Sequence, residues 1–229
     1  MAKFEASVNI SVPPATVSGS AKVRTNLAVQ HIFAAANFAR NAGELEAANA
    51  GQSFSGFFEE ILWNVSASVF FAVAALEADV NEIFIDADLN FREHEKYITD
   101  EIWRLIEQKS ILEKYEMVLT LKKKANFVKG VAFYQNADSL IKLRNALVHF
   151  KPEWSDEKME HLKIENRLNG KFPLSPFLPS SAEFFPKKCM SFGCADWAVK
   201  TALSFRGAFS ILSELPNRFE PYLSRLATK

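Results

Sequence analysis

Apolar and polar positions alternate with the period of an amphipathic helix over most of this chain. Gly51, Gly170 and Pro216 are stop signals for such helices, and Pro152 disfavours helical geometry at Lys151. The pattern predicts helices over about residues 23–51, 54–85, 99–108, 111–124, 136–150, 155–168 and 194–215. The chain is therefore expected to be an all-α helical bundle.

The N-terminal segment follows a different pattern, with a period of two. Apolar residues occupy every second position from Phe4 to Val12, which is typical of a half-buried strand. Pro13 and Pro14 end it, and weak alternation afterwards leaves a short hairpin as an alternative. We expect an N-terminal strand or arm over residues 1–20 and a single helical domain over 21–229. A lone strand needs a partner, and a second subunit is one source of it.

Residues 171–188, "KFPLSPFLPSSAEFFPKK", contain four prolines and four phenylalanines and do not continue the helical pattern. An ordered connection of this kind is either a lid or a surface loop held down by its aromatic side chains, and the second interpretation is favoured.

Composition is that of a folded protein rich in helix formers, with 229 residues, 48% of them hydrophobic and 24% charged. Lys and Arg together number 27, as do Asp and Glu, so there is no global positive field that would hold a polyanion. Any contact with nucleic acid must therefore be local.

Cys189 and Cys194 are too few for a disulfide framework or a four-ligand zinc site, and we expect packed, reduced thiols. No cofactor or metal is expected.

The N-terminus lacks the apolar core of a signal peptide. The apolar stretch Ile61–Leu76 is short for a membrane span and is flanked by acidic residues, so it is interpreted as a buried core helix. A cytoplasmic protein without membrane contact is the default prediction.

Other motifs fail on their spacing. "DADLN" at Asp86 begins like a calcium loop, but Phe91 replaces the required glycine and Tyr97 the closing glutamate. His31, His94 and His161 each lack a neighbour at metal-ligand spacing, which favours structural or surface roles for them.

The segment "LRNALVHF" differs, because it places three polar residues in an apolar helix. On a helical wheel Leu140, Leu143, Leu147 and Phe150 form the core face. Asn145, His149 and Lys142 lie on the opposite side. Arg144 lies between these faces, beside a second apolar stripe of Ile141 and Val148. Such a helix packs on two sides, and a second subunit on one side would form a cleft lined by Arg, Asn and His.

The chemistry of these residues suits a phosphodiester. Arginine offers a fixed fork of donors for phosphate, histidine moves protons near neutral pH, and asparagine orients either. Lys142 and Lys151 are weaker candidates for RNA contacts. An alternative stays open, in which all three residues are structural. Arg144 then buries its apolar stem and keeps its guanidinium in water, Asn145 forms a hydrogen bond to a nearby backbone group, and His149 ends the helix.

The stretch "LIKLRNALVHFKPEW" resembles the signature helix of the HEPN superfamily (higher eukaryotes and prokaryotes nucleotide-binding). In that pattern an arginine and then a polar residue precede a histidine near a helix end, with four to six residues between the arginine and the histidine. Arg144, Asn145 and His149 match it, with four residues between Arg144 and His149. The resemblance covers about fifteen residues. It implies an all-α bundle that dimerises with two motifs facing one cleft, often with metal-independent RNA endonuclease activity. It also implies His149 as acid/base and Arg144 as phosphate ligand.

The leading hypothesis is thus a homodimeric endoribonuclease of HEPN type that uses Arg144, Asn145 and His149. The alternative is a non-catalytic HEPN-like module that binds a nucleotide or a protein partner in the same cleft. A third possibility is that the motif only stabilises a dimer interface. A neutralising or regulatory protein partner is compatible with the first hypothesis.

Overall fold

The computed structural model describes residues 24–92, 94, 96–154 and 159–229, and all regular structure in these residues is helical. Two short helical turns, η1 (Phe184–Lys188) and η2 (Glu220–Arg225), accompany the α-helices. The α-helices are α1 (Ala28–Ala48), α2 (Phe57–Ile85), α3 (Ala87–Asn90), α4 (Lys96–Ile106), α5 (Ile111–Leu121), α6 (Ala132–Val148), α7 (Met159–Leu168) and α8 (Phe192–Ser213). The all-α prediction is confirmed. The predicted strand over residues 1–20 and the first residues of the helix predicted over 155–168 lie outside the described residues.

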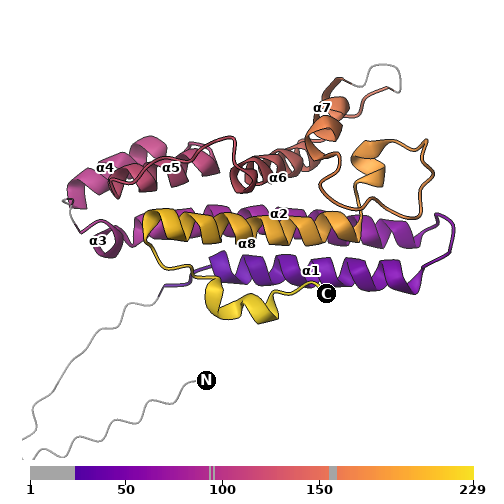
Figure 1. Cartoon of the computed structure of the whole chain (residues 1–229), viewed down its shortest axis with the longest axis horizontal. Coiled ribbons are helices and arrows are strands. Elements are labelled where there is room, and N and C mark those ends of the chain that lie inside the picture. The colour runs from indigo at the N-terminus through magenta and orange to yellow at the C-terminus, as the bar shows by residue number, and fades with distance from the viewer. Residues whose placement is uncertain (1–23, 93, 95, 155–158) are drawn as a thin grey trace, which may run out of the picture.

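Three long helices, α1, α2 and α8, lie side by side and form the body of the bundle (Figure 1). The shorter helices α5 and α6 follow one another along this body and pack against α2 and α8. α7 stands at the far end of α6, next to η1. One hydrophobic core runs through these contacts.

The central helix is α2, which packs against α1, α5, α6 and α8. Its apolar positions, among them Ile61, Val65 and Val69, are buried, as the interpretation of a core helix required. This helix has 29 residues, and an 18-residue window within it has a mean hydropathy of 1.7, so it is also long and apolar enough to cross a membrane, a property that core helices share. The cytoplasmic assignment stays a prediction.

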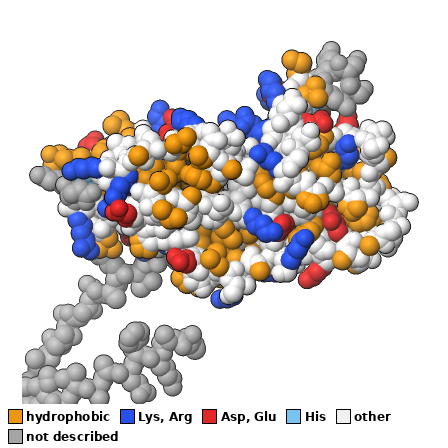
Figure 2. Space-filling view, viewed as in Figure 1, with side chains coloured by type: hydrophobic (Ala, Val, Ile, Leu, Met, Phe, Trp, Pro, Cys, Tyr) orange, Lys and Arg blue, Asp and Glu red, His pale blue; other side chains and the backbone are white. Residues whose placement is uncertain are grey.

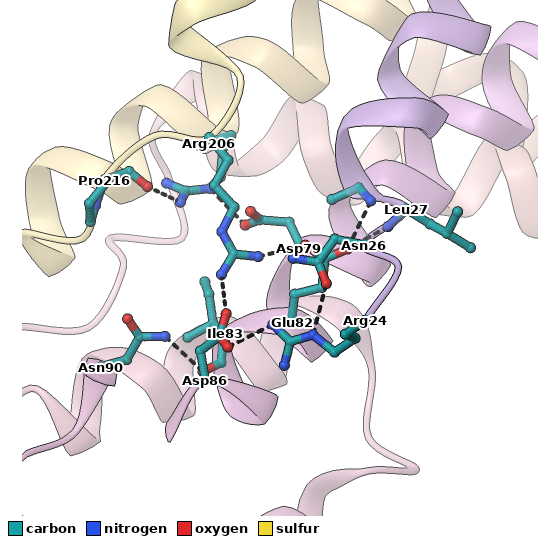
Figure 3. A network of polar contacts seen from close by, with 12 residues as sticks. Arg24, Asn26, Leu27, Asp79, Glu82, Ile83, Asp86, Asn90, Arg206 and Pro216 are labelled. Carbon is teal, nitrogen blue, oxygen red and sulfur yellow. Dashed lines mark hydrogen bonds and ion pairs between the residues drawn. The ribbon is translucent and has the colours of Figure 1, made fainter. Parts of the chain in front are cut away.

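Side chains from neighbouring helices cap the long helices. The carboxylate of Glu82, near the end of α2, accepts the backbone N–H groups of Leu27 and Ala28 at 2.8 and 2.9 Å, where α1 begins (Figure 3). Glu46, near the end of α1, accepts the N–H of Phe192 at the start of α8. These contacts satisfy helix donors that have no partner within their own helix. Each antiparallel helix is thereby fixed in register against its neighbour.

A fully buried ion pair joins α2 to α8 at the centre of the bundle. Asp79 Oδ2 lies 2.6 Å from Arg206 Nε, and the two side chains are 0% and 1% exposed. The Tyr115 hydroxyl of α5 donates to the same carboxylate at 2.9 Å. Arg206 also donates to the carbonyl of Pro216 (Figure 3). This cluster ties α5 and the chain end to the two long helices, and so fixes the layer that contains α6.

The segment 171–188 is a surface loop held by its aromatic side chains, because all four of its phenylalanines are buried: Phe172, Phe177, Phe184 and Phe185. Both cysteines nearby are buried free thiols, as predicted. Burial raises the pKa of Cys189 to about 12 and that of Cys194 further, so neither thiol is a nucleophile at neutral pH.

Candidate functional site

α6 presents the predicted motif, with boundaries that differ from the expected ones. It begins at Ala132, one turn earlier than predicted, and ends at Val148, so that His149 is the residue after the last helical turn. The backbone N–H of His149 still donates to the carbonyl of Asn145 at 2.9 Å. The placement of Phe150 on the core face was wrong, because the helix ends before it; Phe150 is 44% exposed and stacks on His161.

Arg144 points towards the bundle. Its guanidinium lies 3.6 Å from the Glu77 carboxylate of α2, and its side chain is 26% exposed. Glu77 is also 4.0 Å from the buried ammonium of Lys114. The Nε atom of Arg144 is buried and makes no hydrogen bond to the described residues. Arg144 is thus partly committed to a charge cluster inside the chain, with donor capacity left over.

The second apolar stripe beside Arg144 is divided in the structure. Ile141 is buried within the chain, whereas Val148 is about half exposed. Only the end of this stripe, next to His149, is therefore open to another molecule.

His149 is exposed and has no side-chain partner among the described residues. It lines a pocket of about 280 Å³ between the end of α6 and α7, together with Lys151, His161, Lys163 and others. One carboxylate, that of Glu160, also lines the pocket and pairs with Lys163 at 2.6 Å. The ammonium group of Lys151 and the imidazole of His149 suit a phosphate group and a proton transfer beside it.

His161 and Glu153 fix the chain on the other side of this pocket. His161 Nε2 lies 3.0 Å from the carbonyl oxygen of Lys151, and Nδ1 lies 3.8 Å from the Glu153 carboxylate. The Glu153 carboxylate also accepts the backbone N–H groups of His161 and Glu160 in the first turn of α7, which lowers its pKa. Because both of its ring nitrogens face partners, His161 acts as an anchor, in agreement with its expected structural role.

The structure brings His149 and Lys151 into one pocket and places Lys142 and Asn145 on the polar face of α6 that leads to it. It does not bring Arg144 into this pocket. Sequence reasoning missed Lys163. The available signal was the short connection from α6 to the next predicted helix, which favours an antiparallel neighbour.

Among the described residues, no group of three or more His, Cys, Asp or Glu side chains is placed to hold a metal ion. Comparisons of the chain with protein-family models, with curated proteins and with solved structures each found no match.

Proposed function

We propose that this chain is a HEPN-like, metal-independent endoribonuclease that works as a homodimer. The ribose 2′-oxygen attacks the adjacent phosphorus while the bond from phosphorus to the 5′-oxygen breaks. One product ends in a 2′,3′-cyclic phosphate and the other in a 5′-hydroxyl. The proton of the 2′-hydroxyl leaves to a base, and the departing 5′-oxygen receives a proton from an acid.

His149 carries one of these proton transfers, and the His149 of a second copy carries the other. The observation that carries the proposal is the exposed, unpartnered imidazole of His149 in a pocket that it shares with the ammonium groups of Lys151 and Lys163. These cations stabilise the negative charge that develops on the phosphate oxygens. Asn145, one helical turn before His149, positions the histidine or the phosphate.

Homodimer formation is favoured by apolar side chains around the pocket. Five large hydrophobic residues between positions 148 and 162 are exposed: Val148, Phe150, Trp154, Met159 and Leu162. Exposed large apolar side chains that lie close together in the sequence indicate a candidate interaction site. A two-fold contact through this patch would cover it with its own copy and supply the second histidine.

The resemblance implies Arg144 as the phosphate ligand, which requires a phosphate to replace Glu77 as its partner on the α2 side of α6, outside the pocket that His149 lines. The pair is 3.6 Å apart and both side chains are partly exposed, so it contributes little to stability and exchanges at low cost. The same ion pair also favours the second candidate, a non-catalytic HEPN-like module that binds a nucleotide or a protein, because Arg144 is then a structural residue.

Incubation of labelled RNA with wild-type protein and with His149→Ala, in EDTA and with end-group analysis, tests the proposal. We expect cleavage by the wild type that leaves cyclic phosphate ends and is lost in His149→Ala. His31→Gln is the control, since it alters a histidine of α1 whose ring packs at a tilt against Phe71 and does not line the pocket. Equal cleavage by wild type and His149→Ala would exclude His149 as the acid/base. Binding without cleavage in a folded dimer would favour the second candidate.

A further inference from the structure

A second polar groove continues from the His149 pocket along α6 and α7. α7 folds back along α6, with Arg167 bonded to Asp138 at 2.5 Å and Lys171 bonded to the side-chain oxygen of Asn136 at 2.7 Å. Between the two helices lies a groove of about 830 Å³. Lys163 lines both this groove and the His149 pocket, so the two hollows adjoin.

Positive charge is concentrated in this groove. Lys129, Lys163, Arg167 and Lys171 line it, whereas Asp138 is its one carboxylate lining residue. The whole chain has no net charge, so this concentration is local. In Figure 2, Lys and Arg side chains are visible over α6 and α7, and others are scattered over the rest of this face. A chain without net charge can bind nucleic acid only through a local cluster of positive charge such as this one.

Three of the four cations pair with a carboxylate: Lys129 with Glu116, Lys163 with Glu160 and Arg167 with Asp138. The cations most available to a phosphate are Lys171 and Lys163. Lys171 is bonded to an uncharged amide oxygen. Lys163 pairs with Glu160 on the surface of α7, where both side chains are more than half exposed. Ion pairs this exposed contribute little to stability, so a phosphate can replace the carboxylate.

The length and the lining residues of the groove suit a single strand of nucleic acid. His149 comes 13 positions after Asn136, which corresponds to about 20 Å of helix, the length of about six stacked nucleotides at about 3.4 Å each. Amide side chains of Gln135 and Asn166 and the ring of Tyr134 also line the groove. They supply hydrogen bonds and a stacking surface for bases.

We propose that the groove between α6 and α7 binds the phosphodiester backbone of single-stranded RNA and leads it from Lys171 to His149. This inference rests on the proposed function for the place where the strand is cut. The groove supplies binding without a sequence preference, and the His149 pocket receives the phosphate at its end.

Fluorescence anisotropy with a labelled 12-nucleotide oligouridylate, over about 50–200 mM KCl, tests this inference. The full chain carrying His149→Ala is the parent, so that the RNA stays intact. The groove variant adds Lys163→Gln and Lys171→Gln. The control adds Lys96→Gln and Lys200→Gln instead, which removes the same charge at two lysines that are 63% and 65% exposed, as Lys163 is 65% exposed.

We expect the groove variant to bind about tenfold more weakly at the lowest salt, and the slope of log affinity against log salt to fall by about 1.4, or about 0.7 for each lost phosphate contact. Lys171→Gln alone should give about half of this change in slope and checks the result with less disturbance. The control should stay within about twofold of the parent.

Equal losses in the groove variant and the control, no binding by the parent, or equally tight binding of duplex RNA would overturn the inference. The two proposals fail separately. Binding through the groove without cleavage by the wild type would remove the nuclease and keep the groove. Cleavage by the wild type, together with an RNA affinity of the groove variant that equals that of its parent, would exclude the groove and keep the nuclease.

Discussion

The buried ion pair between Asp79 and Arg206 supports a quantitative stability prediction. The substitution Asp79→Asn keeps the shape of the side chain but leaves the Arg206 guanidinium buried without a counter-charge, at 1% exposure. Breaking a buried pair from one side costs about 3–5 kcal/mol. With an m value of about 3 kcal/mol/M for a domain of this size, the urea midpoint should fall by about 1–1.7 M.

A matched control is available in the same chain. Arg104 and Glu101 are also 2.6 Å apart, but they lie on the surface of α4 with exposures of 72% and 62%. The substitution Glu101→Gln should change the free energy of unfolding by no more than about 0.5 kcal/mol. Circular dichroism in urea, at one protein concentration, measures both variants.

Replacement of both partners distinguishes the cost of an unpaired charge from the value of the pair. Burial raises the pKa of Asp79 even though Arg206 opposes it, so removal from water costs this carboxylate more than pairing returns. The double variant Asp79→Leu/Arg206→Met should therefore be more stable than Asp79→Asn. Equal midpoint shifts for Asp79→Asn and Glu101→Gln, or a double variant less stable than Asp79→Asn, would refute this reasoning.

Three further predictions concern the site and its frame. Glu77→Gln should free Arg144 and raise RNA affinity several-fold in the anisotropy assay; unchanged affinity would contradict the role of Arg144 as a phosphate ligand. Burial raises the pKa of Glu46 above its ordinary 4.5, so its negative charge opposes folding increasingly as the pH rises from 4 to 7. Glu46→Gln keeps the acceptor for the N–H of Phe192 and should therefore become more stable relative to wild type over this pH range. Urea unfolding of both proteins at pH 4 and pH 7 measures this difference, and a change of the opposite sign would contradict the prediction. Trp154→Ser with Phe150→Ser should shift a dimer towards monomer in light scattering, and an unchanged mass would place the interface elsewhere.

Helical periodicity predicted the long helices well, because each of them buries one continuous apolar face. Residues 111–124 were predicted as helical, and α5 covers Ile111–Leu121; residues 54–85 were predicted, and α2 covers Phe57–Ile85. Helix ends were predicted less well. The start of α8 at Phe192 has both a local and a distant contact: the N-cap hydroxyl of Ser191 accepts the N–H of Cys194 at 3.1 Å, and Glu46 of α1 accepts the N–H of Phe192. The first turn of α6 has no side-chain cap, so no capping residue marks it in the sequence.

The motif on α6 could be found from the sequence, but its surroundings could not. The wheel placed Arg144 and His149 about 140° apart, and in the structure they accordingly face α2 and the α7 side. The Arg144–Glu77 pair, the contribution of Lys163 and the groove beside it depend on the packing of α6 against α2 and α7, which no local pattern encodes.

Chemical rescue of His149→Ala by imidazole tests most directly whether His149 transfers a proton during RNA cleavage. The cavity left by the substitution lies at an exposed position beside the pocket, so free imidazole can reach it. We expect cleavage by His149→Ala to rise with imidazole concentration and to leave cyclic phosphate ends, while wild-type cleavage does not rise. A folded His149→Ala protein that stays inactive at every imidazole concentration, beside an active wild type, would contradict a proton-transfer role and leave His149 a positioning residue.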